Sequence, residues 1–143
     1  MNARGFTFLE LLVVMLLIAI SSSLVYLSVG RSVAQKEGRL FASEMMGVVK
    51  KARSASISTG RPVAFCISSQ DRFCWVEGRQ VKLDIPEKIR VQQQGMANID
   101  NDVYAIYFYP DGSSSGGEVT LAVGNKPFFV FRVDILTGIV TTG

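Results

Sequence analysis

The first 60 residues divide into two stretches that differ in how their hydrophobic positions are arranged. Residues 6–29 are apolar almost throughout, and Glu10 is the only charged residue among them. A helix of that length covers about 36 Å, which is enough to cross a bilayer. The pattern therefore predicts a helix that lies in a membrane or in another apolar environment.

From residue 30 onward, apolar side chains recur at spacings of three and four residues, as expected for a helix with one face on a core. These positions are Val33, Leu40, Phe41, Met45, Val48, Val49, Ala52 and Ala55. No proline interrupts residues 6–60, and Gly60 followed by Pro62 marks a helix end. We expect one helix over Phe6–Thr59. Lys50, Lys51 and Arg53 are assigned to its solvated face rather than to a nucleic-acid or phospholipid site.

After residue 60 the pattern changes to short β-prone runs separated by turn residues. The predicted strands are 62–68, 73–77, 80–85, 88–93, 103–109, 118–123, 128–134 and 139–142. Pro110-Asp111-Gly112 predicts a turn, and residues 113–117 predict a loose, exposed loop. One long helix followed by runs of neighbouring strands indicates an α+β fold with antiparallel sheets.

Composition excludes several kinds of chemistry. The net charge is +3, and the chain contains no histidine, which excludes Ser-His-Asp triads and histidine-ligated metals. Asp100-Asn101-Asp102 lacks a spaced set of further oxygen ligands, so a surface turn is favoured over a calcium site. Trp75 and the pair Phe128-Phe129 are assigned to the core. We expect no enzyme activity, cofactor, metal or small-molecule substrate.

The two cysteines, Cys66 and Cys74, flank the first predicted hairpin turn. An odd number of loop residues would place them directly opposite each other, where they could form a disulfide. An even number would place them on opposite faces of the sheet. The disulfide is the favoured expectation because the domain is predicted to lie in an oxidising compartment.

The start of the chain differs from an ordinary secretory signal, in which the cut follows the apolar stretch. Here the candidate cut, after Gly5, precedes that stretch, so cleavage would leave the apolar helix on the protein. Arg4 lies on the amino-terminal side of the helix. The positive-inside tendency then places the N-terminus in the cytoplasm and the body on the other side of the membrane.

The segment Gly5-Phe6-Thr7-Phe8-Leu9-Glu10 resembles the class III signal of type IV prepilins and type II secretion pseudopilins. The resemblance implies cleavage between Gly5 and Phe6 by a prepilin peptidase, N-methylation of Phe6, and polymerisation through the helix. The chain would then comprise a leader (1–5), a transmembrane and assembly helix (6–29), an amphipathic continuation (30–60) and a periplasmic β-rich domain (61–143).

Glu10 is interpreted within that resemblance. A charge inside a bilayer costs about 2.5–3.5 kcal/mol on insertion scales, so it requires a partner. Cleavage would create one, because Phe6 would gain a free ammonium group that methylation leaves charged. We expect Glu10 of one subunit to form a salt bridge with the Phe6 ammonium of its neighbour. The alternative is that Glu10 lies solvated at the membrane interface.

The rest of the chain is similar to the GspH/FimT family of minor pilin-like proteins. The similar segments are Ala52–Ile57, Phe65-Cys66, Phe108–Ser113 and Gly138–Val140. The resemblance implies a pilin-like fold and the function of a minor pseudopilin in a type II secretion system, anchored in the bacterial inner membrane. The implied partners are the prepilin peptidase and the major and tip pseudopilins.

The alternative within the same family is a FimT-like minor pilin of a type IV pilus, acting in pilus assembly or DNA uptake. Phosphate contacts dominate the affinity of proteins for DNA. The sequence contains no lysine or arginine after Arg132. We therefore expect no nucleic-acid partner, and the secretion pseudopilus is the favoured function.

Overall fold

The computed structural model describes the backbone of residues 7–143 and the side chains of residues 7–22 and 36–143. The chain forms two compact units, Met1–Ala34 and Gln35–Gly143. The predicted leader, the cut between Gly5 and Phe6 and the side chain of Val33 lie outside the described residues, so these expectations stay predictions.

Helix α1 spans Phe8–Thr59. Thr7 caps its start, because the Thr7 hydroxyl accepts the Glu10 N–H at 3.3 Å and the Thr7 carbonyl accepts the Glu10 and Leu11 N–H groups at 3.1 and 3.2 Å. Gly60 ends the helix with a φ of 64°, in the left-handed region where glycine has no steric penalty. The predicted helix and its end at Gly60 are confirmed for the described residues.

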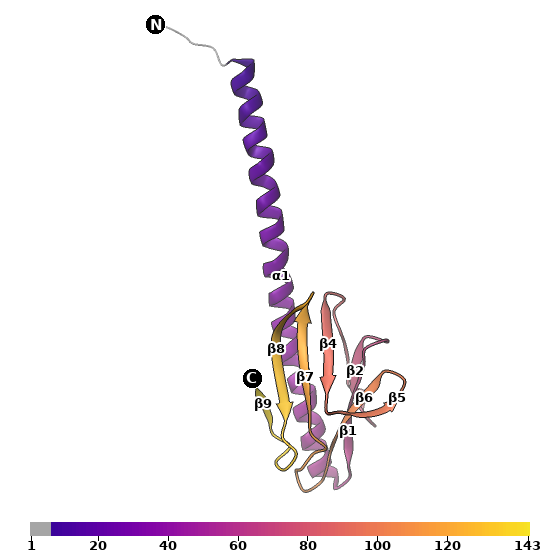
Figure 1. The fold of residues 1–143 in the computed structure, drawn as a ribbon. Helices are drawn as coiled ribbons and strands as arrows, with labels where there is room; N and C mark the ends of the chain where they lie inside the picture. The colour runs from indigo at the N-terminus through magenta and orange to yellow at the C-terminus, as the bar shows by residue number, and fades with distance from the viewer. Residues whose placement is uncertain (1–6) are drawn as a thin grey trace. The chain divides into compact units, whose positions relative to one another are not determined.

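In the described residues that follow the helix, nine strands form two antiparallel sheets (Figure 1). The first sheet has the order β3-β2-β1-β6-β5, with strands Lys82–Asp84, Phe73–Val76, Val63–Ser68, Val103–Phe108 and Ala97–Asp100. The second has the order β4-β7-β8-β9, with strands Ile89–Gln94, Gly117–Val123, Lys126–Val133 and Val140–Thr142. The α+β fold class with antiparallel sheets is thereby confirmed.

The sequence analysis missed strand β5. Its four residues are all exposed, and its pairing with β6 shifts register between Asn98 and Asp100. A strand that buries no side chain lacks the alternation of apolar and polar residues from which strands are predicted. Only its pairing with β6 makes it a strand.

The main core lies between one face of α1 and the inner faces of the two sheets. Its helical members are Phe41, Ala42, Met45, Val48, Val49 and Ala52, and its strand members include Phe65, Ile106, Leu121 and Phe131. Leu40, which was expected on this face, is 67% exposed, so that expectation was wrong. A Cβ atom on Gly38 would lie 2.6 Å from the Phe128 ring, which shows how closely β8 approaches the helix.

The segment between β6 and β7 is not the loose loop that its composition suggested. Ser114 is only 3% exposed, and its hydroxyl donates to the Asp134 carbonyl at 2.8 Å. Ser114 also forms a β-bridge with Phe108. The run of serine and glycine predicted a loose loop. The serine hydroxyls instead form hydrogen bonds with backbone groups of Asp134, Tyr107 and Gly116, and these hold the segment in place.

Candidate assembly surfaces

The leading stretch of α1, Phe8–Ile20, is apolar and uncovered in its own unit. Every described side chain from Thr7 to Ser22 is exposed. Its large apolar side chains are between 44% and 83% exposed; they are Phe8, Leu9, Leu11, Leu12, Val13, Val14, Met15, Leu16, Leu17, Ile18 and Ile20. A continuous apolar surface of this kind marks a site of contact with lipid or with another protein.

No helix in the described part of the chain is long and apolar enough to cross a membrane. The predicted transmembrane range, 6–29, extends beyond that part at residue 6 and, for side chains, at residues 23–29. The membrane span therefore stays a prediction.

Glu10 lies in the first turn of α1, three residues after the capping Thr7. This spacing is that of a capping box, in which a threonine and a glutamate stabilise the start of a helix. A carboxylate in the first turn also interacts favourably with the helix dipole. The sequence analysis missed this local role, although the Thr-x-x-Glu pattern signals it. Phe6 lies outside the described residues, so its salt bridge with Glu10 stays a prediction.

The expected disulfide between Cys66 and Cys74 is absent, and both residues are free, buried cysteines. Ser68 pairs with Phe73, which leaves four residues in the turn and pairs Cys66 with Trp75 and Cys74 with Ile67. The even loop length therefore places the two thiols on opposite faces of the first sheet. Cys74 joins the main core, and Cys66 joins a second cluster with Trp75.

Burial also makes both thiols poor nucleophiles. Burial, reinforced by the charge of Glu77, raises the pKa of Cys66 to about 11. Burial, reinforced by Asp84, raises the pKa of Cys74 to about 12. Only the thiolate attacks electrophiles or binds metals, so neither cysteine provides a catalytic or metal-binding group near neutral pH.

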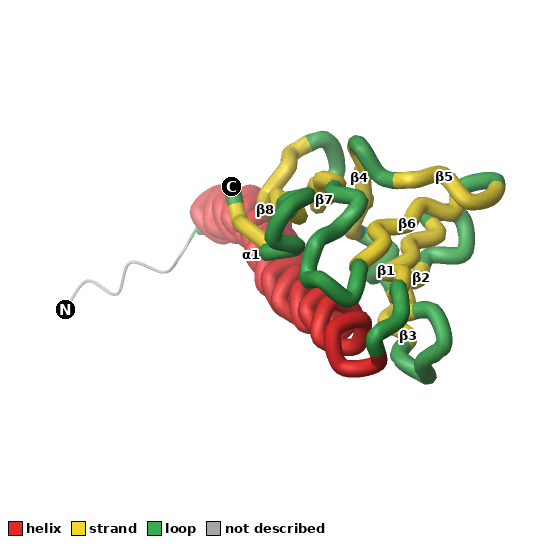
Figure 2. Tube along the Cα trace, turned by 90° about the horizontal axis from the view of Figure 1, so that it is seen from below, coloured by secondary structure: helices red, strands yellow, loops and turns green. Residues whose placement is uncertain are grey.

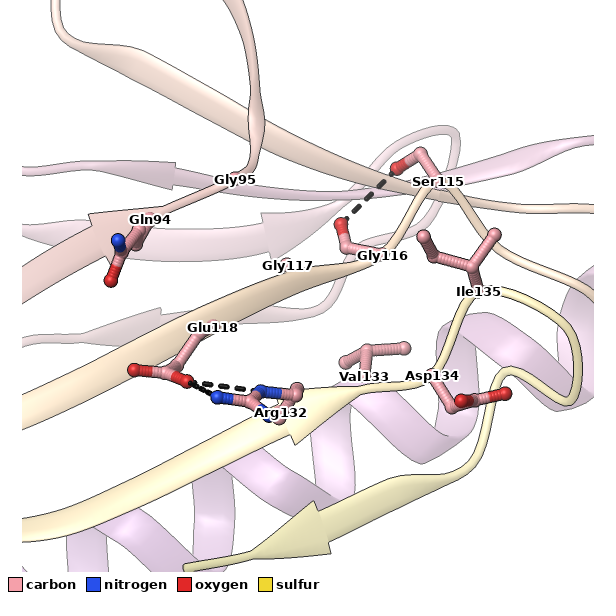
Figure 3. Close-up of a pocket in the computed structure, with 10 residues that line it drawn as sticks. All are labelled: Gln94, Gly95, Ser115, Gly116, Gly117, Glu118, Arg132, Val133, Asp134 and Ile135. Carbon is pink, nitrogen blue, oxygen red and sulfur yellow. Dashed lines mark hydrogen bonds and ion pairs between the residues drawn. The ribbon is translucent and has the colours of Figure 1, made fainter.

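A surface cleft of about 410 Å³ lies where β4, β7 and β8 meet the segment before β7 (Figure 3). It contains the ion pair between Glu118 and Arg132, whose oxygen and nitrogen are 2.5 Å apart. A Cβ atom on Gly116 would lie 2.6 Å from Ile135, so bare backbone forms part of the wall. A third charged residue of the cleft, Asp134, accepts the N–H groups of Leu136 and Thr137 with its carboxylate.

Arg53 does not belong to a cationic surface with Lys50 and Lys51. Both lysines are exposed, whereas Arg53 is partly buried and donates from Nε to the Thr137 carbonyl at 3.1 Å. Ser56 lies one turn further along the helix, and its hydroxyl donates a hydrogen bond to the Tyr109 carbonyl oxygen at 3.1 Å. These two side chains attach the loops after β8 and β6 to the last turns of α1.

Asp100 and Asp102 border the turn between β5 and β6, as expected. Asp102 adopts a φ of 66°, and the Asn101 N–H donates to the Asp100 carboxylate at 2.7 Å. Within the described residues, no group of three or more histidine, cysteine, aspartate and glutamate side chains is placed to hold a metal ion.

A helix that leads with exposed apolar residues and continues into antiparallel sheets is the arrangement expected of the pilin-like fold. Two crystal structures of the type IV minor pilin FimU from Pseudomonas aeruginosa share this fold. One has a TM-score of 0.61 at 12% identity, over 76% of this chain and 90% of FimU. The other has a TM-score of 0.58 at 13% identity, over 73% of this chain and 91% of FimU.

Sequence comparison identifies the family. The model of the family "Type II transport protein GspH" matches residues 42–137, and that of the "Prokaryotic N-terminal methylation motif" matches residues 1–26. The chain belongs to the GspH family. It is 29% identical to type II secretion system protein H of Xanthomonas campestris, over 98% of this chain and 83% of the relative. It is 28% identical to type II secretion system protein H of Escherichia coli K12, over 94% of this chain and 83% of that relative.

Proposed function

We propose that this chain is a minor pseudopilin of a type II secretion system. It assembles through its N-terminal helix into a periplasmic pseudopilus that helps to export folded proteins. The observation that carries this proposal is the combination of a GspH-family domain with a leading helix stretch whose apolar side chains are all exposed. That stretch needs an apolar partner outside its own unit, and the cores of filaments provide one.

We further propose that a prepilin peptidase cuts the chain between Gly5 and Phe6 and that Phe6 is then methylated. The match of residues 1–26 to an N-terminal methylation motif supports this processing. The described position of Glu10, in the first turn of α1, supports its role as the acceptor for a neighbour's Phe6 ammonium. Before assembly, the helix would anchor the chain in the inner membrane, with the β-rich domain in the periplasm.

The major and tip pseudopilins would be its partners, and its role would be structural rather than enzymatic. A minor pilin of a type IV pilus is the second candidate, because FimU shares the fold. At 12% identity that likeness concerns the fold alone. The two relatives at 28% and 29% identity are both named as secretion proteins, which favours the secretion pseudopilus.

Deletion of the gene in its host separates the two candidates. We expect exported proteins to accumulate in the periplasm, while pilus-dependent motility and DNA uptake stay at wild-type levels. Complementation with the full-length chain should restore export, and mass spectrometry should show a mature chain that begins with methylated Phe6. Normal export combined with lost motility would assign the protein to a pilus instead.

A further inference from the structure

The two cysteines lie on neighbouring strands of the first sheet but on its opposite faces. In Figure 2, β1 runs beside β2, with β6 on the other side of β1. Cys66 is 3% exposed and packs with Trp75, whereas Cys74 is buried in the main core. A disulfide brings two Cβ atoms to about 3.5–4.5 Å, and side chains on opposite faces of a sheet point away from each other. The folded chain therefore cannot join its thiols while β1 and β2 are paired in this register.

A disulfide between the two cysteines would require a different hairpin. Cys66 faces Cys74 directly only if the pairing of β1 and β2 slips by one residue, which shortens the turn from four residues to three. A slip of one residue moves every side chain of the slipped strand to the other face. Trp75 would enter the main core, and the buried Val76 would leave it. The disulfide and the native core are therefore mutually exclusive.

Arg72, the last residue of the four-residue turn, holds the native register. Its carbonyl accepts the Ile85 N–H at 2.8 Å, and its Nη2 donates to the carbonyls of Ile85, Pro86 and Ile89. Arg72 adopts a φ of 57°, in the left-handed region that non-glycine residues rarely occupy. Its buried Nε has no acceptor among the described residues. Contacts with the segment before β4 thus stabilise a turn that is locally unfavourable.

These contacts form only when distant parts of the chain have come together. Ile85 and Ile89 lie 13 and 17 positions beyond Arg72, so a hairpin that forms alone lacks these acceptors. Hairpin loops of three and of four residues are both common. Until the segment at 85–89 packs against the turn, both registers are therefore accessible to the chain.

In the unfolded chain, the two thiols can form a disulfide readily. They are eight positions apart, and closing so short a loop costs little chain entropy. One cysteine thiolate attacks a disulfide donor R–S–S–R, whose S–S bond breaks, so that a mixed disulfide forms and one R–SH leaves. The second cysteine attacks the mixed disulfide and releases the other R–SH. The two cysteines are thereby oxidised, and the donor is reduced to two thiols.

The folded chain resists the same reaction. Both cysteines lie on inner strands of the sheet, and such strands separate only in the largest unfolding events. Burial also raises the pKa of Cys66 to about 11 and that of Cys74 to about 12, which keeps both protonated near neutral pH. Folding and oxidation therefore compete for the same two thiols.

We propose that Cys66 and Cys74 form a redox-sensitive switch on folding. A disulfide donor that reaches the chain before β1 and β2 pair joins the two cysteines and prevents the native sheet and core from forming. A chain that folds first keeps both thiols and stays competent for assembly, and reduction of the disulfide restores folding. Only the compartment rests on the proposed function, which places the domain in the oxidising periplasm.

Refolding of the purified full-length chain in detergent tests the switch. The chain is unfolded, treated with oxidised glutathione until mass spectrometry shows the Cys66–Cys74 disulfide, and diluted into native buffer. We expect less than about a tenth of the unfolding transition reported by Trp75 fluorescence to return, and dithiothreitol to restore it. The reduced chain and the double variant Cys66→Ala, Cys74→Ala are the controls and should refold without reductant. A native transition in the oxidised chain would overturn the proposal.

The rate of oxidation provides a second measurement on the same chain. We expect the disulfide to form at least about a hundredfold more slowly in the folded chain than in the unfolded one, at equal glutathione concentration. Similar rates in the two states would overturn the competition between folding and oxidation.

Arg72→Gly tests what holds the register, because glycine adopts the left-handed backbone freely and only the side-chain contacts are lost. When refolding begins in oxidised glutathione, we expect the ratio of disulfide-linked to folded chains to rise about tenfold over the wild type. Met45→Ala, which weakens the core elsewhere, is the matched control for lost stability and should show a smaller rise. An equal ratio in Arg72→Gly and the wild type would contradict the role of Arg72.

Expression in the host distinguishes this inference from the proposed function. Diamide added during synthesis should cause loss of protease-resistant wild-type chain, whereas the double variant without cysteines should keep its amount and its export. Equal losses of the two chains would contradict the switch. Normal export in the deletion strain would contradict the proposed function and leave the refolding results unchanged.

Discussion

Helix α1 contains two apolar stretches that meet opposite environments. In the leading stretch, Phe8–Ile20, large side chains point in all directions and every one is exposed. In the stretch Phe41–Ala55, which we call the docked stretch, the apolar residues at positions 41, 42, 45, 48, 49, 52 and 55 are buried, and Met46 is partly buried. The two stretches have similar residue types and differ in periodicity.

This difference in periodicity gives one stretch a role in folding and the other a role in assembly. A helix with apolar residues on one face buries that face against its own domain and leaves the other face to water. A helix that is apolar all round cannot be satisfied by one domain and is completed by lipid or by other helices. The docked stretch therefore contributes to the stability of the single chain, whereas the leading stretch acts only when a membrane or a filament surrounds it.

The contrast between the two stretches requires that the core beneath the docked stretch is closed to solvent. Cys74 lies in that core, and burial raises its pKa to about 12. We expect iodoacetamide at pH 8 to label Cys74 about a thousandfold more slowly in the folded chain than in denaturant, because only the thiolate reacts. Labelling of the detergent-solubilised chain, followed by peptide mass spectrometry, measures both rates, and similar rates would show an open core.

Truncation inside the docked stretch should destabilise the chain. We expect Met45→Ala to lower the free energy of unfolding by about 2–5 kcal/mol, because it leaves a cavity in the core. Leu40→Ala, on the exposed side of the same helix, should change it by about 0.5 kcal/mol or less. Urea unfolding followed by Trp75 fluorescence provides the measurement. Equal losses for the two variants would contradict the burial assigned to Met45 and Leu40.

Truncation inside the leading stretch should act on assembly and leave the fold intact. We expect Glu10→Ala to insert and to be cleaved normally, while its incorporation into filaments falls about a hundredfold. The reason is that an unpaired Phe6 ammonium in an apolar core costs about 2.5–3.5 kcal/mol. Glu10→Asp keeps the charge and should retain part of the incorporation. The amount of the chain in sheared filaments measures the effect, and normal incorporation of Glu10→Ala would refute the salt bridge.

The smallest expected effect concerns the start of the leading stretch. Thr7→Ala removes the hydroxyl that accepts the Glu10 N–H, so the first turn should lose about 0.5–2 kcal/mol of local stability. Thr7→Ser retains a capping hydroxyl and is the control. Hydrogen exchange at the Glu10 amide reports the opening of this turn. Unchanged exchange in Thr7→Ala would show that the cap does not contribute to the helix start.

Much of the fold could be predicted because its signals are local. The helix end at Gly60, the turn at Pro110–Gly112 and eight of the nine strands follow from turn residues and hydrophobic patterns along the chain. Strand β5 could not be predicted because none of its side chains is buried. The buried Ser114 was also missed, since its hydrogen bond joins residues 20 positions apart.

The candidate assembly surfaces divide in the same way. The exposure of the leading stretch could be predicted from its long apolar run. The expectation that Glu10 needs a charged partner followed from the position of this charge within that run. Leu40 and Phe41 are adjacent and both apolar, and only the packing of β8 and its neighbours on α1 buries one and exposes the other. The exposed side chains of Ile57, Tyr109, Ile135, Leu136 and Ile139 come from three segments far apart in the sequence, so no local pattern contains them.

The sequence by itself determined the long helix, the α+β class and the need of the leading stretch for an apolar partner, because each depends on the order of neighbouring residues. The tertiary structure alone decided three further features: the register that separates Cys66 from Cys74, the attachment of two loops to α1 by Arg53 and Ser56, and the exposure of Leu136. Each of these depends on which distant backbones and side chains come within a few ångströms of one another. Only the folded chain specifies those distances.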